Sequence, residues 1–221
     1  FLMRHNVKAV IVACNTASAA ALRMLRTEFP EAPIVGMEPA VKPAAEHTTS
    51  GVVGVLATPA TFQGELYASV VERFAKGVTV LQDTCPGLVT RIEQGDLTSP
   101  ETRGILEKAL HPMIPRGLDT GVLGCTHYPF VIDLIQEIAG PGVRVIDPAP
   151  AVARQVGRVL DAHGLRAPEG PPAPARFLTT GETGQLAGIL HSLLNIEGEV
   201  EQLRWDGLRL PPKPIFRRSQ L

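Results

Sequence analysis

Two cysteines stand in matching positions of the sequence, each directly after a short apolar run and before a stretch of helical composition. Cys14 follows the run Val7–Ala13, and Cys125 follows residues 121–124. Such runs are typical of parallel strands buried on both faces, and ligands bind at the carboxyl edge of parallel sheets. The partial positive charge of a helix amino-terminus favours thiolate, and its free N–H groups can hold a carboxylate. The pattern therefore indicates two thiols at a ligand site.

Polar side chains follow both thiols. Asn15 and Thr16 come after the first cysteine, and Thr126 and His127 come after the second. Asn15, Thr16 and Thr126 are expected to hold the carboxylate and ammonium groups of a substrate. His127 is expected to tune the adjacent thiol and to act as a further acid or base. The alternative for His127 is a helix-capping or buried structural role.

The elements that position these groups alternate between strand and helix along the chain. Further strands are predicted at 34–37, 52–56, 78–81, 143–146 and 176–180, and helices at 17–29, 63–74, 88–94, 100–114, 130–139, 151–163 and 182–194. This alternation predicts an α/β protein with parallel sheets. Proline-rich stretches at 163–175 and 210–221 are expected to be irregular.

A weak internal repeat predicts how the chain divides. Each cysteine segment ends, after a helix and a strand, in an acid–Pro–Ala sequence, at Glu38–Ala40 and at Asp147–Ala149. The repeat predicts two similar α/β domains related by a pseudo-twofold axis, with the chain crossing between them at these sequences. The first domain would comprise residues 1–38 and 147–221 and carry the first cysteine. The second would comprise residues 39–146 and carry the other.

Composition argues against several classes of protein. The 21 Lys and Arg residues nearly balance the 22 Asp and Glu residues, so a nucleic-acid or anionic-membrane partner is not expected. No apolar run approaches the ~20 residues that a membrane helix needs, and the start lacks a signal-peptide pattern. A cytoplasmic protein is expected. The three widely spaced cysteines predict neither a disulfide framework nor a metal site, and Cys85 is expected to be structural.

The segments around both cysteines resemble the two signature segments of the glutamate racemases. These are residues 12–18, Val-Ala-Cys-Asn-Thr-Ala-Ser, and residues 124–129, Gly-Cys-Thr-His-Tyr-Pro. Further similar segments follow the family order, at 36–40, 54–61, 85–89 with Glu93, and 179–181. The resemblance extends from residue 7 to about residue 205.

The resemblance implies a reaction for the two thiols. Glutamate racemases interconvert L- and D-glutamate without pyridoxal phosphate, and they supply D-glutamate for peptidoglycan synthesis. A thiolate removes the α-proton from one face while a thiol returns a proton to the other; cysteine, with an unperturbed pKa of ~8.5, suits both roles. Positioned donors and a closed site must then stabilise the carbanion. We expect catalysis by Cys14 and Cys125 in the cleft between the domains, with no cofactor and no metal.

The resemblance also implies roles for residues outside the cysteine segments. Glu93 would lie near the pocket as an assisting carboxylate, and Thr58 and Thr61 would bind the substrate through their hydroxyls. A surface carboxylate and turn-capping threonines are the alternative interpretations. The expected partner is glutamate, and because dimers are common in the family, a homodimer is a further expectation.

The sequence departs from the family pattern at its start. The Asp-Ser and Tyr-Gly segments of the family do not occur, so about the first sixty residues of the pattern are expected to be missing, with sheet edge exposed as a result. Two other functions remain open. An aspartate or other amino-acid racemase of the same superfamily is disfavoured by His127, where those enzymes usually carry glutamate. A non-catalytic binding protein on this fold is disfavoured by the intact cysteines.

Overall fold

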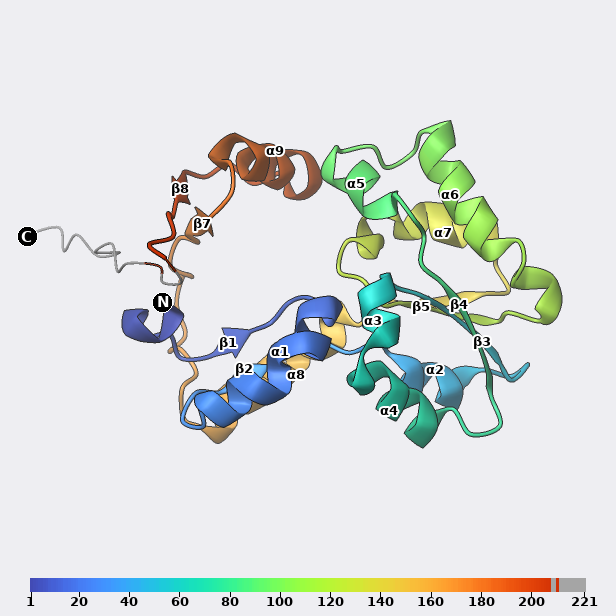
Figure 1. The fold of residues 1–221 in the computed structure, drawn as a ribbon, viewed down its shortest axis with the longest axis horizontal. Coiled ribbons are helices and arrows are strands. Elements are labelled where there is room, and N and C mark those ends of the chain that lie inside the picture. Colours follow the sequence, from blue (N-terminus) through green and yellow to red (C-terminus); the bar gives the residue numbers. More distant parts are fainter. Residues whose placement is uncertain (208–209, 211–221) are drawn as a thin grey trace, which may run out of the picture.

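The computed structural model describes residues 1–207 and residue 210 and contains three parallel sheets (Figure 1). Their strand orders are β1-β2, β4-β3-β5-β6 and β7-β8, and every strand pair is parallel. The predicted α/β class with parallel sheets is confirmed. The predicted irregular tail at 210–221 lies, apart from Leu210, outside the described residues.

Strands and helices alternate as the sequence predicts. The strands are β1 (Val10–Ile11), β2 (Ile34–Val35), β3 (Val52–Leu56), β4 (Thr79–Asp83), β5 (Thr120–Leu123), β6 (Arg144–Ile146), β7 (Phe177–Thr179) and β8 (Val200–Gln202). The α-helices are α1 (Asn15–Glu28), α2 (Val41–His47), α3 (Pro59–Gln63), α4 (Glu65–Phe74), α5 (Leu88–Glu93), α6 (Pro100–Leu110), α7 (Ile132–Ala139), α8 (Ala149–Ala162) and α9 (Thr183–Leu194). Short 3-10 helices are η1 (Leu2–His5), η2 (Ile114–Arg116) and η3 (Tyr128–Val131).

The four-stranded sheet is covered on both faces by helices (Figure 1). Successive side chains of a strand point to opposite faces, so Val53 and Val55 of β3 pack towards α2 and α4, while Leu56 packs towards α5, α6 and α7. All three side chains are at most 2% exposed. Burying each contributes about 1.5–3 kcal/mol. The sheet is therefore a rigid platform for the residues that follow β3 and β5.

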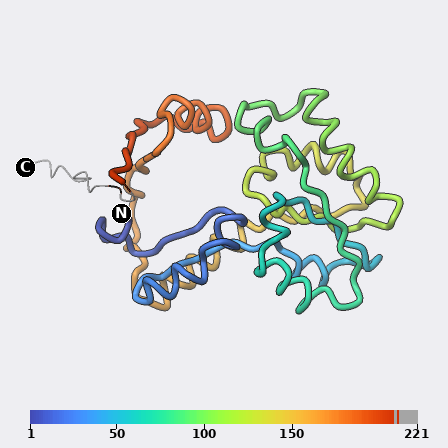
Figure 2. The backbone as a smooth tube through the Cα atoms, viewed as in Figure 1, coloured from blue at the N-terminus to red at the C-terminus, as the bar shows by residue number. Residues whose placement is uncertain are grey.

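The smaller part of the molecule holds the two-stranded sheets. Helices α1 and α8 accompany β1 and β2, and α9 accompanies β7 and β8 (Figure 1). The chain leaves this part after β2 and returns to it after β6, and Figure 2 traces both passages. At its far end, α9 reaches the larger part. A Cβ added at Gly95, beyond α5, would lie 3.8 Å from Ser192 of α9.

Several predicted bounds were wrong. The strand predicted over 7–13 is only Val10–Ile11, because its ladder partner β2 is equally short. The helix predicted over 100–114 ends at Leu110, where Pro112 cannot donate to a helical carbonyl. Helix α2 was not predicted; its Pro43 falls in the first turn, where no N–H is needed. Strand β8 was also missed. Among the described helices, none is long and apolar enough to cross a membrane.

Candidate active site

Cys14 lies between β1 and α1 and caps the amino-terminus of that helix. Its backbone is extended, with φ −154° and ψ 125°, and its Sγ accepts a hydrogen bond from the Ala17 N–H at 3.4 Å. The thiol is half-buried. Its position at the amino-terminus of a helix is the one that the sequence predicts.

Cys125 follows β5 and is 8% exposed. The residue before it must be glycine, because a Cβ on Gly124 would lie 2.8 Å from the Cβ of Ala57 after β3. The helix expected to begin at Phe130 begins at Ile132, and η3 lies between it and Cys125. Cys125 is thus not at an α-helix amino-terminus, contrary to the prediction, because the chain turns first through this 3-10 segment.

The environment of the Cys125 thiol favours its neutral form. Burial raises the pKa of Cys125, and the nearby Cys14 and Glu93 groups add to this effect. The backbone N–H groups of His127 and Tyr128 near the thiol oppose the rise of this pKa. The two thiols therefore sit in unlike settings, one at a helix amino-terminus and one in a buried pocket.

His127 connects Cys125 to Glu93. Its Nδ1 lies 3.7 Å from Cys125 Sγ, and its Nε2 lies 3.0 Å from Glu93 Oε1. With the proton on Nε2, the imidazole donates to Glu93 and leaves Nδ1 free to accept from the thiol. The side chains of His127 and Glu93 are 33% and 38% exposed, so solvent weakens the ion pair and orientation is its main contribution. The arrangement of thiol, base and orienting carboxylate is one that activates nucleophiles and bases.

Three threonine hydroxyls form a closed cluster between α1 and α3. Thr16 Oγ1 lies 2.6 Å from Thr58 Oγ1 and 3.2 Å from Thr61 Oγ1, and the latter two are 3.1 Å apart. Thr61 is 1% exposed. The cluster joins the segment after Cys14 to the segment after β3, and its rotatable hydroxyls can turn towards a bound anion.

The two cysteines line one cavity of about 110 Å³. Its lining consists of Cys14, Asn15, Thr16, Thr58, Val89, Gly124, Cys125, Thr126 and His127. The structure thus brings together most residues that the sequence predicted for the site. Thr61 lies behind Thr16 and Thr58, and Glu93 lies behind His127. Val89 of α5 was missed, because an apolar helix residue gives no chemical signal in the sequence.

The side chain of Asn15 is polar and almost fully buried. The residue is 3% exposed, and neither Oδ1 nor Nδ2 has a hydrogen-bond partner among the described residues. A buried polar group left in this way costs about 1–3 kcal/mol. Such groups occur at sites where a ligand supplies the missing bonds.

A larger cavity, of about 500 Å³, is lined in part by both crossover segments, including Pro39 and Pro148. No thiol or imidazole lines it. The thiols of Cys14 and Cys125 and the imidazole of His127 lie instead at the smaller cavity, which is therefore the candidate active site.

Comparisons with known proteins agree on one family. The sequence profile of the Asp/Glu/Hydantoin racemase family matches residues 2–156. A glutamate racemase from Roseiflexus sp. is 48% identical over 87% of this chain and 71% of its own length. The structure of a glutamate racemase isoform from Bacillus anthracis superposes with a TM-score of 0.78 at 31% identity, covering 89% of this chain and 74% of that one. The Escherichia coli glutamate racemase, solved with L-glutamate and the activator UDP-MurNAc-ala, gives a TM-score of 0.76 at 30% identity over 91% and 75% of the two chains.

Proposed function

The chain belongs to the glutamate racemases, within the Asp/Glu/Hydantoin racemase family, and we propose that it inverts glutamate between the thiols of Cys14 and Cys125. The observation that carries this proposal is that both thiols line the same small cavity. A group on each side of the α-carbon is what inversion by proton transfer requires.

The proton path follows from this arrangement. The thiolate on one side takes the α-proton and becomes a thiol, while the electron pair stays on Cα and spreads into the carboxylate. The thiol on the opposite side then gives its proton to Cα and becomes a thiolate. The two cysteines have exchanged protonation states, so the reverse reaction starts from the other side. His127, held by Glu93, tunes the Cys125 half of this exchange.

Substrate binding would use the polar lining of the cavity. The Asn15 amide, which has no partner among the described residues, would supply hydrogen bonds together with the hydroxyls of Thr16, Thr58 and Thr126. Thr61 would support these hydroxyls from behind. Free N–H groups at the start of α1 add to the attraction for a carboxylate. These donors would replace water around the developing carbanion.

The substrate assignment is tested by racemisation of L-glutamate, with L-aspartate as the comparison, each followed by circular dichroism. Loss of optical activity with glutamate and at least about tenfold slower loss with aspartate is expected, because a pocket fitted to one chain length discriminates by at least this factor. Faster turnover of aspartate would assign an aspartate racemase. Turnover of neither, by a folded protein that still binds glutamate, would assign a binding protein.

The division into domains follows the two acid–Pro–Ala crossovers. One domain would comprise residues 1–38 with the segment from 147 onward, and the other residues 39–146. The location of the four-stranded sheet within 52–146 supports this division, as does the fact that Cys14 and Cys125 follow strands of different sheets. The active site would then lie in the cleft between the domains, and closure would exclude water.

The cellular setting is part of the same proposal. The product would be D-glutamate, made in the cytoplasm for peptidoglycan precursors. A homodimer is the proposed assembly, supported by exposed apolar side chains such as Leu194 and Trp205, which are 49% and 60% exposed. Light scattering on the purified chain tests the assembly.

A further inference from the structure

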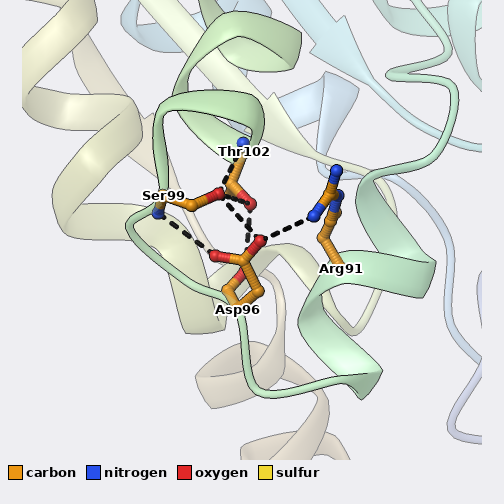
Figure 3. A network of polar contacts seen from close by, with 4 residues as sticks. All are labelled: Arg91, Asp96, Ser99 and Thr102. Atoms are coloured by element: carbon orange, nitrogen blue, oxygen red, sulfur yellow. Dashed lines mark hydrogen bonds and ion pairs between the residues drawn. The ribbon is translucent and has the colours of Figure 1, made fainter.

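A polar cluster fixes the turn that follows Glu93. Glu93 is the last residue of α5, and Asp96 lies in the turn towards α6 (Figure 3). The Asp96 carboxylate accepts hydrogen bonds from Arg91 Nη1 at 3.1 Å, from Ser99 Oγ at 2.8 Å and from the Ser99 N–H at 3.1 Å. These residues do not line the active-site cavity, and the proton path does not use them.

The backbone of the turn is held equally firmly. The Asp96 N–H donates to the Arg91 carbonyl at 2.9 Å, and the Gly95 N–H donates to the Ile92 carbonyl at 2.9 Å. Gly95 has φ +76°, a conformation that glycine adopts without strain. The Thr102 hydroxyl donates to the Asp96 carbonyl at 3.1 Å. Side-chain and backbone bonds thus specify one conformation of the turn.

The cluster ties α5 to a helix anchored in the core. Ser99 caps α6 by accepting the Thr102 N–H at 3.2 Å (Figure 3). Leu106 and Leu110 of α6 are buried, at 0% and 3% exposed. Helix α5 has only six residues, too few to be stable alone. Leu88 and Ile92 anchor it in the core, and the polar cluster bonds its carboxyl end to the start of α6.

We propose that Asp96 is a positioning residue for the racemase reaction: it holds the end of α5 so that Glu93 stays bonded to His127 and His127 stays against Cys125. The inference rests on the proposed function. Hydrogen bonds weaken steeply with displacement, and a shift of about 1 Å at Glu93 would break its 3.0 Å bond to the imidazole.

The test is the variant Asp96→Asn, which keeps the size of the side chain but removes its charge and turns an NH₂ group towards donors. A fall in kcat of about tenfold with KM changed less than about twofold is expected, because substrate contacts are untouched. Asp161→Asn is the matched control. Asp161 pairs with Arg166 beyond α8, away from the cavity lining, and its loss should leave kcat unchanged.

A second measurement separates positioning from general damage. If Asp96 acts through Glu93, Asp96→Asn lowers kcat no further in a protein that already carries Glu93→Gln. Independent, multiplicative losses in the double variant would overturn the proposal. If Asp96→Asn fails to fold, Arg91→Gln decides the same question by the same cycle, since the Arg91 side chain is 38% exposed and tolerates replacement more readily.

The outcomes also separate this inference from the proposed function. A wild-type chain that does not racemise glutamate overturns both. If Glu93→Gln retains the wild-type kcat, Glu93 does not contribute to the reaction. Asp96 then cannot act through Glu93, and the inference fails. A fall in Glu93→Gln together with unchanged kcat in Asp96→Asn and Arg91→Gln overturns this inference alone.

Discussion

His127 places its Nε2 3.0 Å from Glu93 Oε1 while its Nδ1 faces the thiol of Cys125 at 3.7 Å. The imidazole is therefore held from behind and aimed at the sulfur. Among the described residues, no pair of side chains orients Cys14 in this way. Its sulfur instead accepts a hydrogen bond from the N–H of Ala17 in α1. The Cys125 thiol is thus contacted by an oriented imidazole, and the Cys14 thiol by the amino-terminus of a helix.

Replacing Glu93 with glutamine should lower kcat by about 10- to 100-fold, because a neutral amide orients His127 less firmly than a carboxylate does. KM should change little, since Glu93 does not line the cavity. Steady-state racemisation kinetics measure both parameters. Glu107→Gln is the matched control, as Glu107 is a 38% exposed carboxylate paired with Arg103 on α6. Equal kcat values in Glu93→Gln and wild type would contradict the role of Glu93.

Replacing Asn15 should weaken substrate binding without lowering the stability of the protein. In Asn15→Leu, KM for glutamate should rise about tenfold or more through loss of a charge-assisted hydrogen bond. The melting temperature should hold or rise, because a buried unpaired amide is removed. Thermal unfolding and kinetics of the same sample measure both effects.

Ser18, also on α1, is a buried polar residue whose hydroxyl is hydrogen-bonded within the protein, in contrast to the amide of Asn15. It is 2% exposed, donates to the Val12 carbonyl at 3.1 Å and accepts the Met37 N–H at 2.9 Å. Ser18→Ala should therefore destabilise the protein by about 1–3 kcal/mol. A stability loss in Asn15→Leu as large as in Ser18→Ala would show that the amide is satisfied within the protein.

Stability should fall as the solution becomes alkaline. Burial raises the pKa of the Cys85 thiol, and the charge of Asp83 and its hydrogen bond add to the rise; burial likewise raises the pKa of Cys125. Both folded values lie above those of the unfolded chain, so their stabilising effect is complete below the ordinary thiol pKa of ~8.5 and is lost as pH rises beyond it. Burial also raises the pKa of Tyr67 to about 12, which extends the loss to higher pH.

Urea unfolding under reducing conditions at about pH 7.5 and about pH 9.5 measures this loss. In Cys85→Ala the free energy of unfolding should depend less steeply on pH, because one of the ionising thiols is gone. A free energy that stays level or rises between the two pH values would mean that the thiols are not protected from ionisation.

Local patterns in the sequence predicted the platform of the site. The apolar runs of β3 and β5 are buried on both faces, and Cys125 follows β5 after the glycine that close packing requires. The helix after Cys14 was predicted from its composition. The apolar runs and the helical composition depend on neighbouring residues along the chain, whereas the close packing that requires Gly124 depends on Ala57 after β3.

Features that depend on tertiary contacts could not be predicted. The bond between Thr16 and Thr58 joins elements far apart in the sequence, and Val89 reaches the cavity only through the placement of α5. The turn at Asp96 looks from sequence like an ordinary polar loop. Its bonds to Arg91 of α5 and to Ser99, the cap of α6, appear only when the two helices are seen together (Figure 3).

The most direct test of two-thiol inversion is the deuterium content of each glutamate enantiomer, separated by chiral chromatography early in racemisation in D₂O and then read at the α-position by NMR, for the wild type, Cys14→Ser, Cys125→Ser and a Cys85→Ala control. We predict that wild type and control place deuterium on the α-carbon of the product enantiomer while recovered substrate keeps its proton, because the returning proton comes from the second, solvent-exchanged thiol. Each serine variant should lose racemisation by about 10³-fold or more. Undiminished racemisation in either serine variant, or product that retains the substrate's own α-proton, would contradict inversion between Cys14 and Cys125.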